Sequence, residues 1–103
     1  MGTKREKEEL QELQRIVSEA ATKLKCRIFL FGSRAAGTSH RTSDYDLGIK
    51  GLDSQNFRKL KRNILDYHED SRILVGIDII NFDTADDDFL SVAMKDAIEW
   101  PIN

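Results

Sequence analysis

Apolar residues recur at helical intervals near the start of the chain, among many charged residues. The residues that follow this spacing are Leu10, Leu13, Val17, Ala20, Ala21 and Leu24. Such a stripe predicts an amphipathic first helix whose apolar side covers a sheet. Two later segments have the same period, with the apolar faces Phe57, Leu60, Ile64, Leu65 and Phe89, Leu90, Ala93, Ala97. We expect Ser54 to cap the first of these helices, and Thr84 to precede the acidic first turn of the second.

Three short apolar runs predict strands. The first spans Cys26 to Phe31 and stops at Gly32, which predicts a buried strand followed by a tight turn. The second runs from about Tyr45 to Lys50, and the third from Ile73 to Phe82. The gap after Gly32 has room only for a turn and a short helix, whereas a parallel crossover needs roughly a dozen residues or more, so we expect the first two strands to be antiparallel. The predicted fold is therefore α/β (α+β), a small mixed β-sheet of about three to four strands packed with about four helices.

Length and charge narrow the range of functions. The 103 residues suit a single domain that spans 1–103. The 16 basic and 18 acidic residues give a net charge of -2, which does not favour direct binding to nucleic acid. The single Cys26 cannot form an internal disulfide, and no apolar run approaches the roughly 20 residues of a membrane span. We therefore expect a cytoplasmic protein with no membrane partner.

Three acidic residues in the second and third predicted strands are the candidate metal ligands. Asp44 and Asp46 lie two positions apart, so their side chains project from one face and repel each other unless a cation compensates. Asp78 interrupts a run of β-branched apolar residues, where a buried charge needs a partner. It can reach the other two acids if the strands are neighbours. The alternatives are a solvent-exposed strand start, where Asp44 only shapes a turn, and an edge strand with Asp78 in water.

A Gly-Ser turn at the end of the first strand is the candidate phosphate site. Gly32 lets the backbone approach a ligand closely, and the Ser33 hydroxyl and the free N–H groups of a helix start can donate hydrogen bonds to phosphate oxygens. Arg34 follows directly, and its guanidinium could pair with phosphate. The alternatives are an ordinary capped helix start for the turn and a solvated helix residue for Arg34.

The spacing of these residues resembles a known signature. Ten residues separate Ser33 from Asp44, and the Asp-x-Asp pair is followed by the third acid. This pattern resembles the DNA polymerase beta superfamily of nucleotidyltransferases, and most closely its minimal nucleotidyltransferase (MNT) branch. The resemblance implies a polymerase beta-like nucleotidyltransferase fold and nucleotidyl transfer with two Mg²⁺ ions. It assigns catalysis and metal binding to Asp44, Asp46 and Asp78, and nucleotide binding to Gly32, Ser33, Arg34 and Ser43. Ala36 and Tyr45 depart from the family pattern without removing a ligand.

The resemblance also implies an acceptor. MNT proteins are typically encoded beside a HEPN-domain partner, often as antitoxin and toxin, and some transfer AMP from ATP to a tyrosine of that partner. We therefore expect a Mg²⁺-dependent protein adenylyltransferase that uses ATP and acts as the antitoxin of a HEPN-type toxin. Two alternatives stay open. One is a catalytically weak or inactive module that binds nucleotide or partner and neutralises the partner by contact. The other is a small-molecule nucleotidyltransferase that acts as a homodimer.

Overall fold

The sheet has four strands and mixed direction. The structure, a computed structural model, describes residues 3–102. The strand order is β3-β2-β1-β4. Strand β1 (Arg27–Phe31) is antiparallel to β2 (Tyr45–Lys50) and to β4 (Ile98–Trp100), whereas β2 is parallel to β3 (Ile77–Asn81). The predicted mixed sheet and the antiparallel pairing of its first two strands are confirmed.

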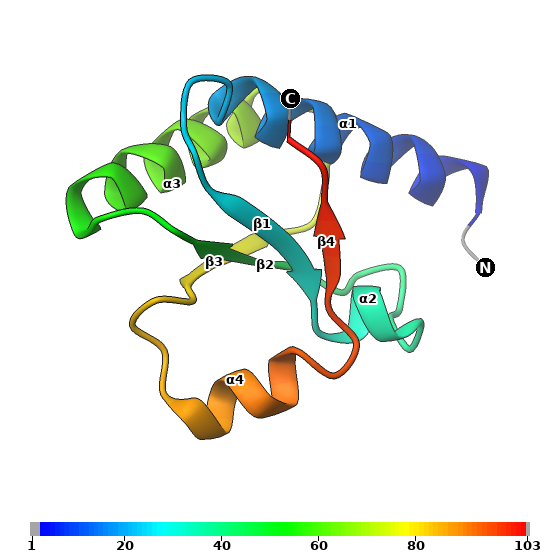
Figure 1. The fold of residues 1–103 in the computed structure, drawn as a ribbon. Coiled ribbons are helices and arrows are strands. Elements are labelled where there is room, and N and C mark those ends of the chain that lie inside the picture. Colours follow the sequence, from blue (N-terminus) through cyan, green and yellow to red (C-terminus); the bar gives the residue numbers. More distant parts are fainter. Residues whose placement is uncertain (1–2, 103) are drawn as a thin grey trace.

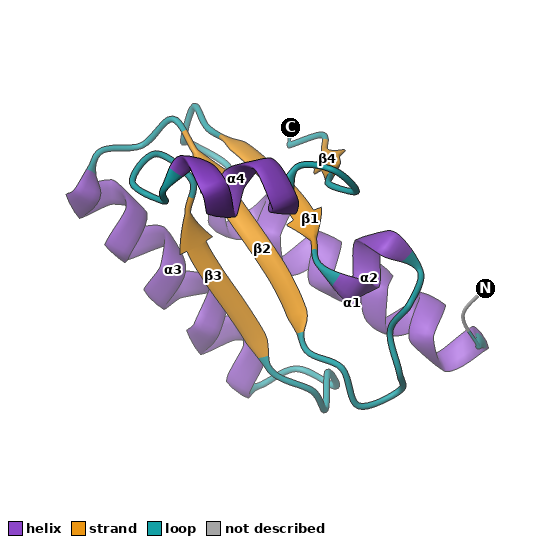
Figure 2. Cartoon of the chain, turned by 90° about the horizontal axis from the view of Figure 1, so that it is seen from below, coloured by secondary structure: helices purple, strands orange, loops and turns teal. Residues whose placement is uncertain are grey.

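Helices cover the two faces of the sheet unequally. Helices α1 (Lys4–Ala20) and α3 (Ser54–Glu69) lie together on one face, and the short α4 (Asp87–Ala93) lies on the other (Figure 1). The helix α2 (Ser33–Ala36) follows the end of β1. Figure 2 shows that α4 crosses the sheet near the ends of β2 and β3 and leaves the starts of these strands uncovered. One part of this sheet face is therefore open.

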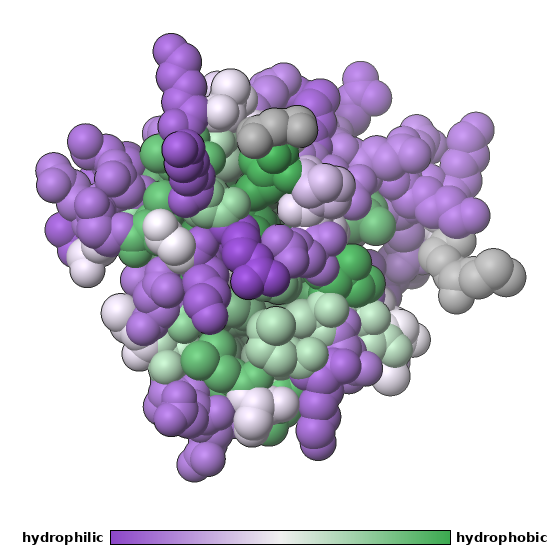
Figure 3. All heavy atoms as spheres, in the orientation of Figure 1, coloured by the Kyte–Doolittle hydropathy of each residue, from purple (hydrophilic) through white to green (hydrophobic). Residues whose placement is uncertain are grey.

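Side chains of successive strand residues point to opposite faces of the sheet, and this produces two separate apolar clusters. The main core joins α1 and α3 to the strand residues Ile28, Leu30, Tyr45, Leu47, Ile49 and Ile79. The residues between these positions project to the opposite face. There Phe29 and Phe31 pack with Phe82 and with Ala93 of α4. Apolar side chains also gather on the surface over α4 (Figure 3), where Phe89, Val92 and Met94 are exposed.

Side-chain caps start α1, α3 and α4, and at α3 the cap is not the predicted residue. Thr3 caps α1, with its hydroxyl accepting a hydrogen bond from the Glu6 amide at 3.2 Å. At α3, the Asp53 carboxylate accepts a hydrogen bond from the Asn56 amide at 2.7 Å, so the prediction of Ser54 as N-cap is wrong by one residue. Asp86 caps α4 in the same way. The last helix ends at Ala93, and residue 97 lies beyond it.

The third strand is shorter than its apolar run predicted. It begins at Ile77 because β2 begins at Tyr45, the residue paired with Ile77, and a ladder needs residues on both sides. The preceding segment is held by side chains instead, since the Leu74 amide donates a hydrogen bond to Glu9 at 3.3 Å. The strand β4 was not predicted. Its three residues are too few for a period, and pairing with the free edge of β1 creates it.

Candidate functional site

The fold brings the three predicted carboxylates to the open face of the sheet. Asp46 lies directly opposite Asp78 in the parallel ladder between β2 and β3, and Asp44 precedes β2 by one residue. Because Tyr45 and Leu47 belong to the core on the helical side, Asp44 and Asp46 project from the other side. Residues from two distant parts of the chain therefore meet at the starts of two neighbouring strands.

Asp46 is the electrostatic centre of this group. Its side chain is partly buried, and burial raises the pKa of its carboxyl, with further contributions from the charges of Asp78 and then Asp44. Both effects disfavour the ionised form. A bound cation would compensate the repulsion and favour ionisation of Asp46.

Asp78 and Asp44 are more exposed than Asp46. The structure places Asp78 on the edge strand β3 with an exposed side chain, so the expectation that it would be a buried charge is wrong. Asp44 is exposed, and its Oδ1 accepts a hydrogen bond from the Gly76 amide at 3.0 Å. The Tyr45 amide in turn donates to the Gly76 carbonyl at 3.0 Å. These two bonds tie the start of β2 to the residue that precedes β3.

The donor set suits a hard divalent cation, although its side chains are not gathered as ligands. Carboxylate oxygens are the ligands that Mg²⁺ prefers. Within residues 3–102, no three His, Cys, Asp or Glu side chains are arranged to hold a metal ion together. Of the two carboxylate oxygens of Asp44, Oδ1 is the one that accepts the hydrogen bond from the Gly76 amide. The chemistry and the shared face therefore fit Mg²⁺, and side-chain rotation is required to complete the site.

The Gly-Ser turn lies directly against Asp46. Gly32 has φ 74° and ψ −157°, a conformation almost restricted to glycine, and its carbonyl accepts hydrogen bonds from the Ala35 and Ala36 amides. A Cβ added to Gly32 would overlap the Oδ2 atom of Asp46 and lie 3.2 Å from its Cγ. The absence of a side chain at Gly32 therefore leaves the space that the Asp46 carboxylate occupies. The predicted phosphate-binding turn and the predicted metal ligand are immediate neighbours.

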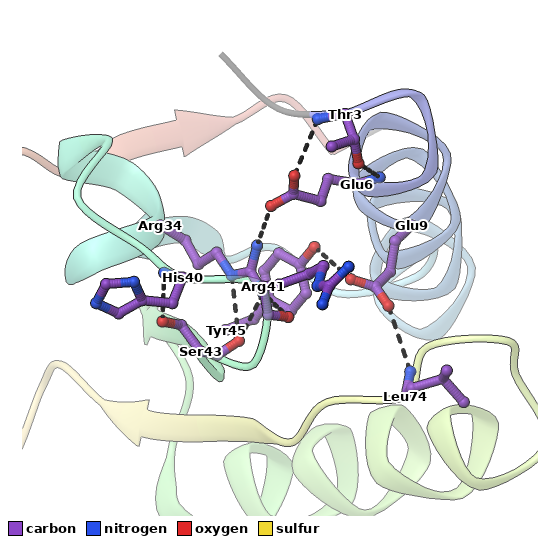
Figure 4. A network of polar contacts seen from close by, with 9 residues as sticks. All are labelled: Thr3, Glu6, Glu9, Arg34, His40, Arg41, Ser43, Tyr45 and Leu74. Carbon is purple, nitrogen blue, oxygen red and sulfur yellow. Dashed lines mark hydrogen bonds and ion pairs between the residues drawn. The ribbon is translucent and has the colours of Figure 1, made fainter.

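Arg34 lies on the helical side of β2, against the Tyr45 ring (Figure 4). Asp44 and Asp46 project from the opposite side of the sheet. The Arg34 side chain is only 6% exposed, so the alternative of a solvated helix residue is wrong. The guanidinium donates to the Ser43 carbonyl from Nε at 3.2 Å and from Nη2 at 2.7 Å, and Nη1 pairs with Glu6 at 3.3 Å. It also stacks 4.5 Å from the centre of the Tyr45 ring. The predicted phosphate contact would require Arg34 to leave these partners.

Ser43 joins the same group of polar contacts. Its hydroxyl accepts a hydrogen bond from the His40 amide at 2.8 Å, and its carbonyl accepts those of Arg34. Tyr45, which stands between the two acids of β2, donates from its hydroxyl to Glu9 at 2.9 Å. The sequence had not suggested roles for Glu6 and Glu9. The signal that could have found them is the large aromatic residue at a buried strand position beside two charged ones, because a buried phenol needs a hydrogen-bond partner.

Comparisons with known proteins agree with this arrangement. A family model described as "Polymerase beta, Nucleotidyltransferase" matches residues 9–99. No curated protein matches the chain. In the part of the chain that the structure describes, no helix is both long and apolar enough to cross a membrane.

Solved structures share the fold at low sequence identity. A crystal structure of a mutant MntA-HpeT toxin-antitoxin has a TM-score of 0.62 and 17% identity, covering 87% of this chain and 73% of the other. A crystal structure of a toxin-antitoxin with AMP-PNP has a TM-score of 0.58 and 21% identity, covering 93% and 73%. A second MntA-HpeT mutant has a TM-score of 0.58 and 19% identity, covering 94% and 72%.

Proposed function

The chain belongs to the polymerase beta nucleotidyltransferase family, and from this premise we propose that it transfers AMP from ATP to a hydroxyl group of a partner protein. We propose further that the partner is a HEPN-type toxin, that the acceptor is a tyrosine, and that the protein acts as the antitoxin. The toxin-antitoxin neighbours, one of them crystallised with AMP-PNP, support this choice of nucleotide and partner.

The observation that carries the proposal is the position of Asp46. It lies opposite Asp78, and the charges of Asp78 and Asp44 raise the pKa of its carboxyl. Its Oδ2 atom occupies the space that a side chain at Gly32 would fill. In our proposal Asp44, Asp46 and Asp78 hold two Mg²⁺ ions on the open sheet face. When bound, the ions would neutralise the triphosphate and lower the pKa of the acceptor hydroxyl.

The protein's own residues would orient the reactants. A triphosphate held at Asp46 would lie against the Gly32–Ser33 turn, where the Ser33 hydroxyl and nearby amides can donate hydrogen bonds to it. The acceptor oxygen would approach from the side of Asp78, which is exposed to solvent on the edge strand. That oxygen forms the new bond to the α-phosphorus, the bond from this phosphorus to the pyrophosphate oxygen breaks, and the hydroxyl proton leaves to solvent.

The proposal is tested by a transfer assay. The protein is incubated with ATP labelled at the α-phosphate, Mg²⁺ and a HEPN-type toxin as the proposed partner, and label is followed on that partner. We expect transfer by the wild type, and at least a ~100-fold loss in Asp44→Asn and in Asp46→Asn. Asp66→Asn, on the exposed surface of α3, is the matched control and should transfer normally. Transfer that survives both active-site changes would contradict the proposal.

A contact-only antitoxin is the second candidate, and one observation favours it. Among the described residues no three His, Cys, Asp or Glu side chains are arranged as ligands of one metal ion. Such a protein would bind its partner tightly without releasing pyrophosphate. Measuring partner affinity and pyrophosphate release for wild type and Asp78→Asn separates the two functions. Wild-type release that Asp78→Asn abolishes supports catalysis, whereas tight binding by both proteins without release supports neutralisation by contact.

A further inference from the structure

We infer that Arg34 and Tyr45 are positioning residues that hold the carboxylates of β2 in place from the opposite face of the sheet. This inference rests on the proposed function, because it concerns the same carboxylates. It assigns to Arg34 a role other than phosphate binding, and it gives a role to Tyr45, one of the two residues that depart from the family pattern. The network involved, which we call the rear network, consists of Glu6, Glu9, Arg34, Ser43 and Tyr45 (Figure 4).

Arg34 fixes the backbone immediately before Asp44. Two of its nitrogens donate to one carbonyl, that of Ser43, at 3.2 and 2.7 Å, and Nη2 also donates to the Arg41 carbonyl at 3.3 Å. A guanidinium can make such contacts in a fixed planar geometry, which an ammonium cannot reproduce. Since its side chain is almost fully buried, Arg34 has little access to water as a substitute partner. The peptide unit that leads into Asp44 is therefore held on its carbonyl side.

Tyr45 fixes the residue between the two acids. Its side chain is 2% exposed, its ring lies under the Arg34 guanidinium, and its hydroxyl donates to Glu9 Oε1 at 2.9 Å. Neighbouring residues of a strand point to opposite faces, so the orientation of Tyr45 sets that of Asp44 and Asp46. A contact on the helical side thus controls side chains on the open side.

Glu9 extends this control to the second strand of the site. Its Oε2 accepts a hydrogen bond from the Leu74 amide at 3.3 Å, while its Oε1 accepts from Tyr45. Leu74 lies two residues before Gly76, whose amide donates to Asp44. One carboxylate therefore joins the start of β2 to the segment that enters β3, and so helps to set how Asp46 faces Asp78.

Polar contacts add to packing in fixing these side chains. Tyr45 is packed in the main core, and the Arg34 guanidinium stacks on its ring. Arg34, Tyr45 and Glu6 also border a pocket of about 410 Å³, with Leu10 and Leu30 among the other lining residues. Removing one polar contact while the packed groups stay in place should therefore show how far that contact sets the geometry.

Two conservative variants with matched controls test the inference. Tyr45→Phe removes only the hydroxyl, and Tyr67→Phe removes the same group from the exposed side chain of Tyr67 on α3. Arg34→Lys keeps the charge but cannot make the paired contact with Ser43, and Arg15→Lys makes the same change at an exposed ion pair of α1. For each folded protein we would measure binding of Mg²⁺ with AMP-PNP by calorimetry, and amide hydrogen exchange over residues 43–47.

We expect Tyr45→Phe and Arg34→Lys to weaken Mg²⁺-dependent AMP-PNP binding by about tenfold, the scale seen when residues that support metal ligands are changed. We also expect faster exchange of the amides at 43–47 in these two variants only. A Tyr45→Phe protein that binds and exchanges like the Tyr67→Phe control would overturn the inference. If Tyr45→Phe does not fold, the comparison of Arg34→Lys with its control Arg15→Lys decides whether the inference holds. If wild type itself fails to bind Mg²⁺ with AMP-PNP, the proposed function fails, and the exchange measurement still decides the positioning role.

Discussion

Replacing Gly32 by alanine tests whether the turn between β1 and α2 makes the place for the Asp46 carboxylate. Gly32 lies in a backbone region almost exclusive to glycine, with φ 74° and ψ −157°, so alanine there would strain the chain. The added Cβ would also overlap Asp46 Oδ2. Because the end of an aspartate side chain can rotate, we expect the carboxylate to turn away while the backbone stays in place.

Backbone strain and displacement of the Asp46 carboxylate can be measured separately, as stability and as ligand binding. Backbone strain should lower the free energy of unfolding by about 1–3 kcal/mol. The rotated carboxylate would no longer face Asp44 and Asp78, so Mg²⁺-dependent AMP-PNP binding should weaken at least about tenfold, equivalent to about 1.4 kcal/mol. Gly37→Ala provides the matched control. Gly37 has φ 81° and ψ 16°, where alanine costs about 1–2 kcal/mol, and nothing lies within 4 Å of its added Cβ.

Urea unfolding in EDTA and calorimetric titration with Mg²⁺ and AMP-PNP measure the two effects separately. We expect Gly32→Ala and Gly37→Ala to lose similar stability, whereas only Gly32→Ala loses ligand binding. Equal binding by the two folded variants would refute the reasoning, because it would mean that contact between Gly32 and Asp46 has no part in the site. A far larger loss of stability in Gly32→Ala would show that the backbone moves instead of the carboxylate.

Three further predictions follow from the described contacts. Burial, and then the hydrogen bond to Glu9, raise the pKa of the Tyr45 hydroxyl to about 12 from its usual 10.0. The protonated Tyr45 should therefore stabilise the fold fully below pH 10.0, and this stabilisation should be lost as the pH rises towards 12, as urea unfolding of wild type and Tyr45→Phe at alkaline pH would show. Burial and the neighbouring acids raise the pKa of Asp46, so without metal Asp46→Asn should increase the free energy of unfolding at neutral pH, and the gain should vanish as pH falls through the pKa of Asp46. A Cβ at Gly48 would overlap the ring of Phe82, which is 3% exposed and stacked 5.8 Å from Phe29; Gly48→Ala should therefore cost about 1–3 kcal/mol in denaturant unfolding, and less in a Phe82→Leu background.

Local periodicity was enough to predict the elements that bear the site. The second strand has the predicted bounds, Tyr45–Lys50, and it is antiparallel to β1 because the connection was too short for a crossover. Alternation along this strand placed Asp44 and Asp46 on one face before any tertiary contact was known. The Gly32–Ser33 turn with a short helix after it was also predictable, since a glycine that stops an apolar run is a local signal.

Contacts between distant segments decided what the sequence could not. The β-branched neighbours of Asp78 predict a buried charge, but β3 is an edge strand and the side chain is exposed, as in the alternative placement. Strand order is set by contacts between segments that lie far apart in the chain, and no short stretch of sequence contains that information. For the same reason β4, with three residues, became a strand only by pairing with β1.

The position of Arg34 shows most clearly what the sequence determined and what only the tertiary structure decided. By itself, the sequence determined that two acids share a strand face, that a glycine turn precedes them, and that an arginine follows this turn. Only the tertiary structure decided that the arginine turns to the helical side, because its partners Glu6, Ser43 and Tyr45 come from three different segments. A charged side chain is directed by the acceptors that surround it in space, and residues far apart in the chain supply those acceptors.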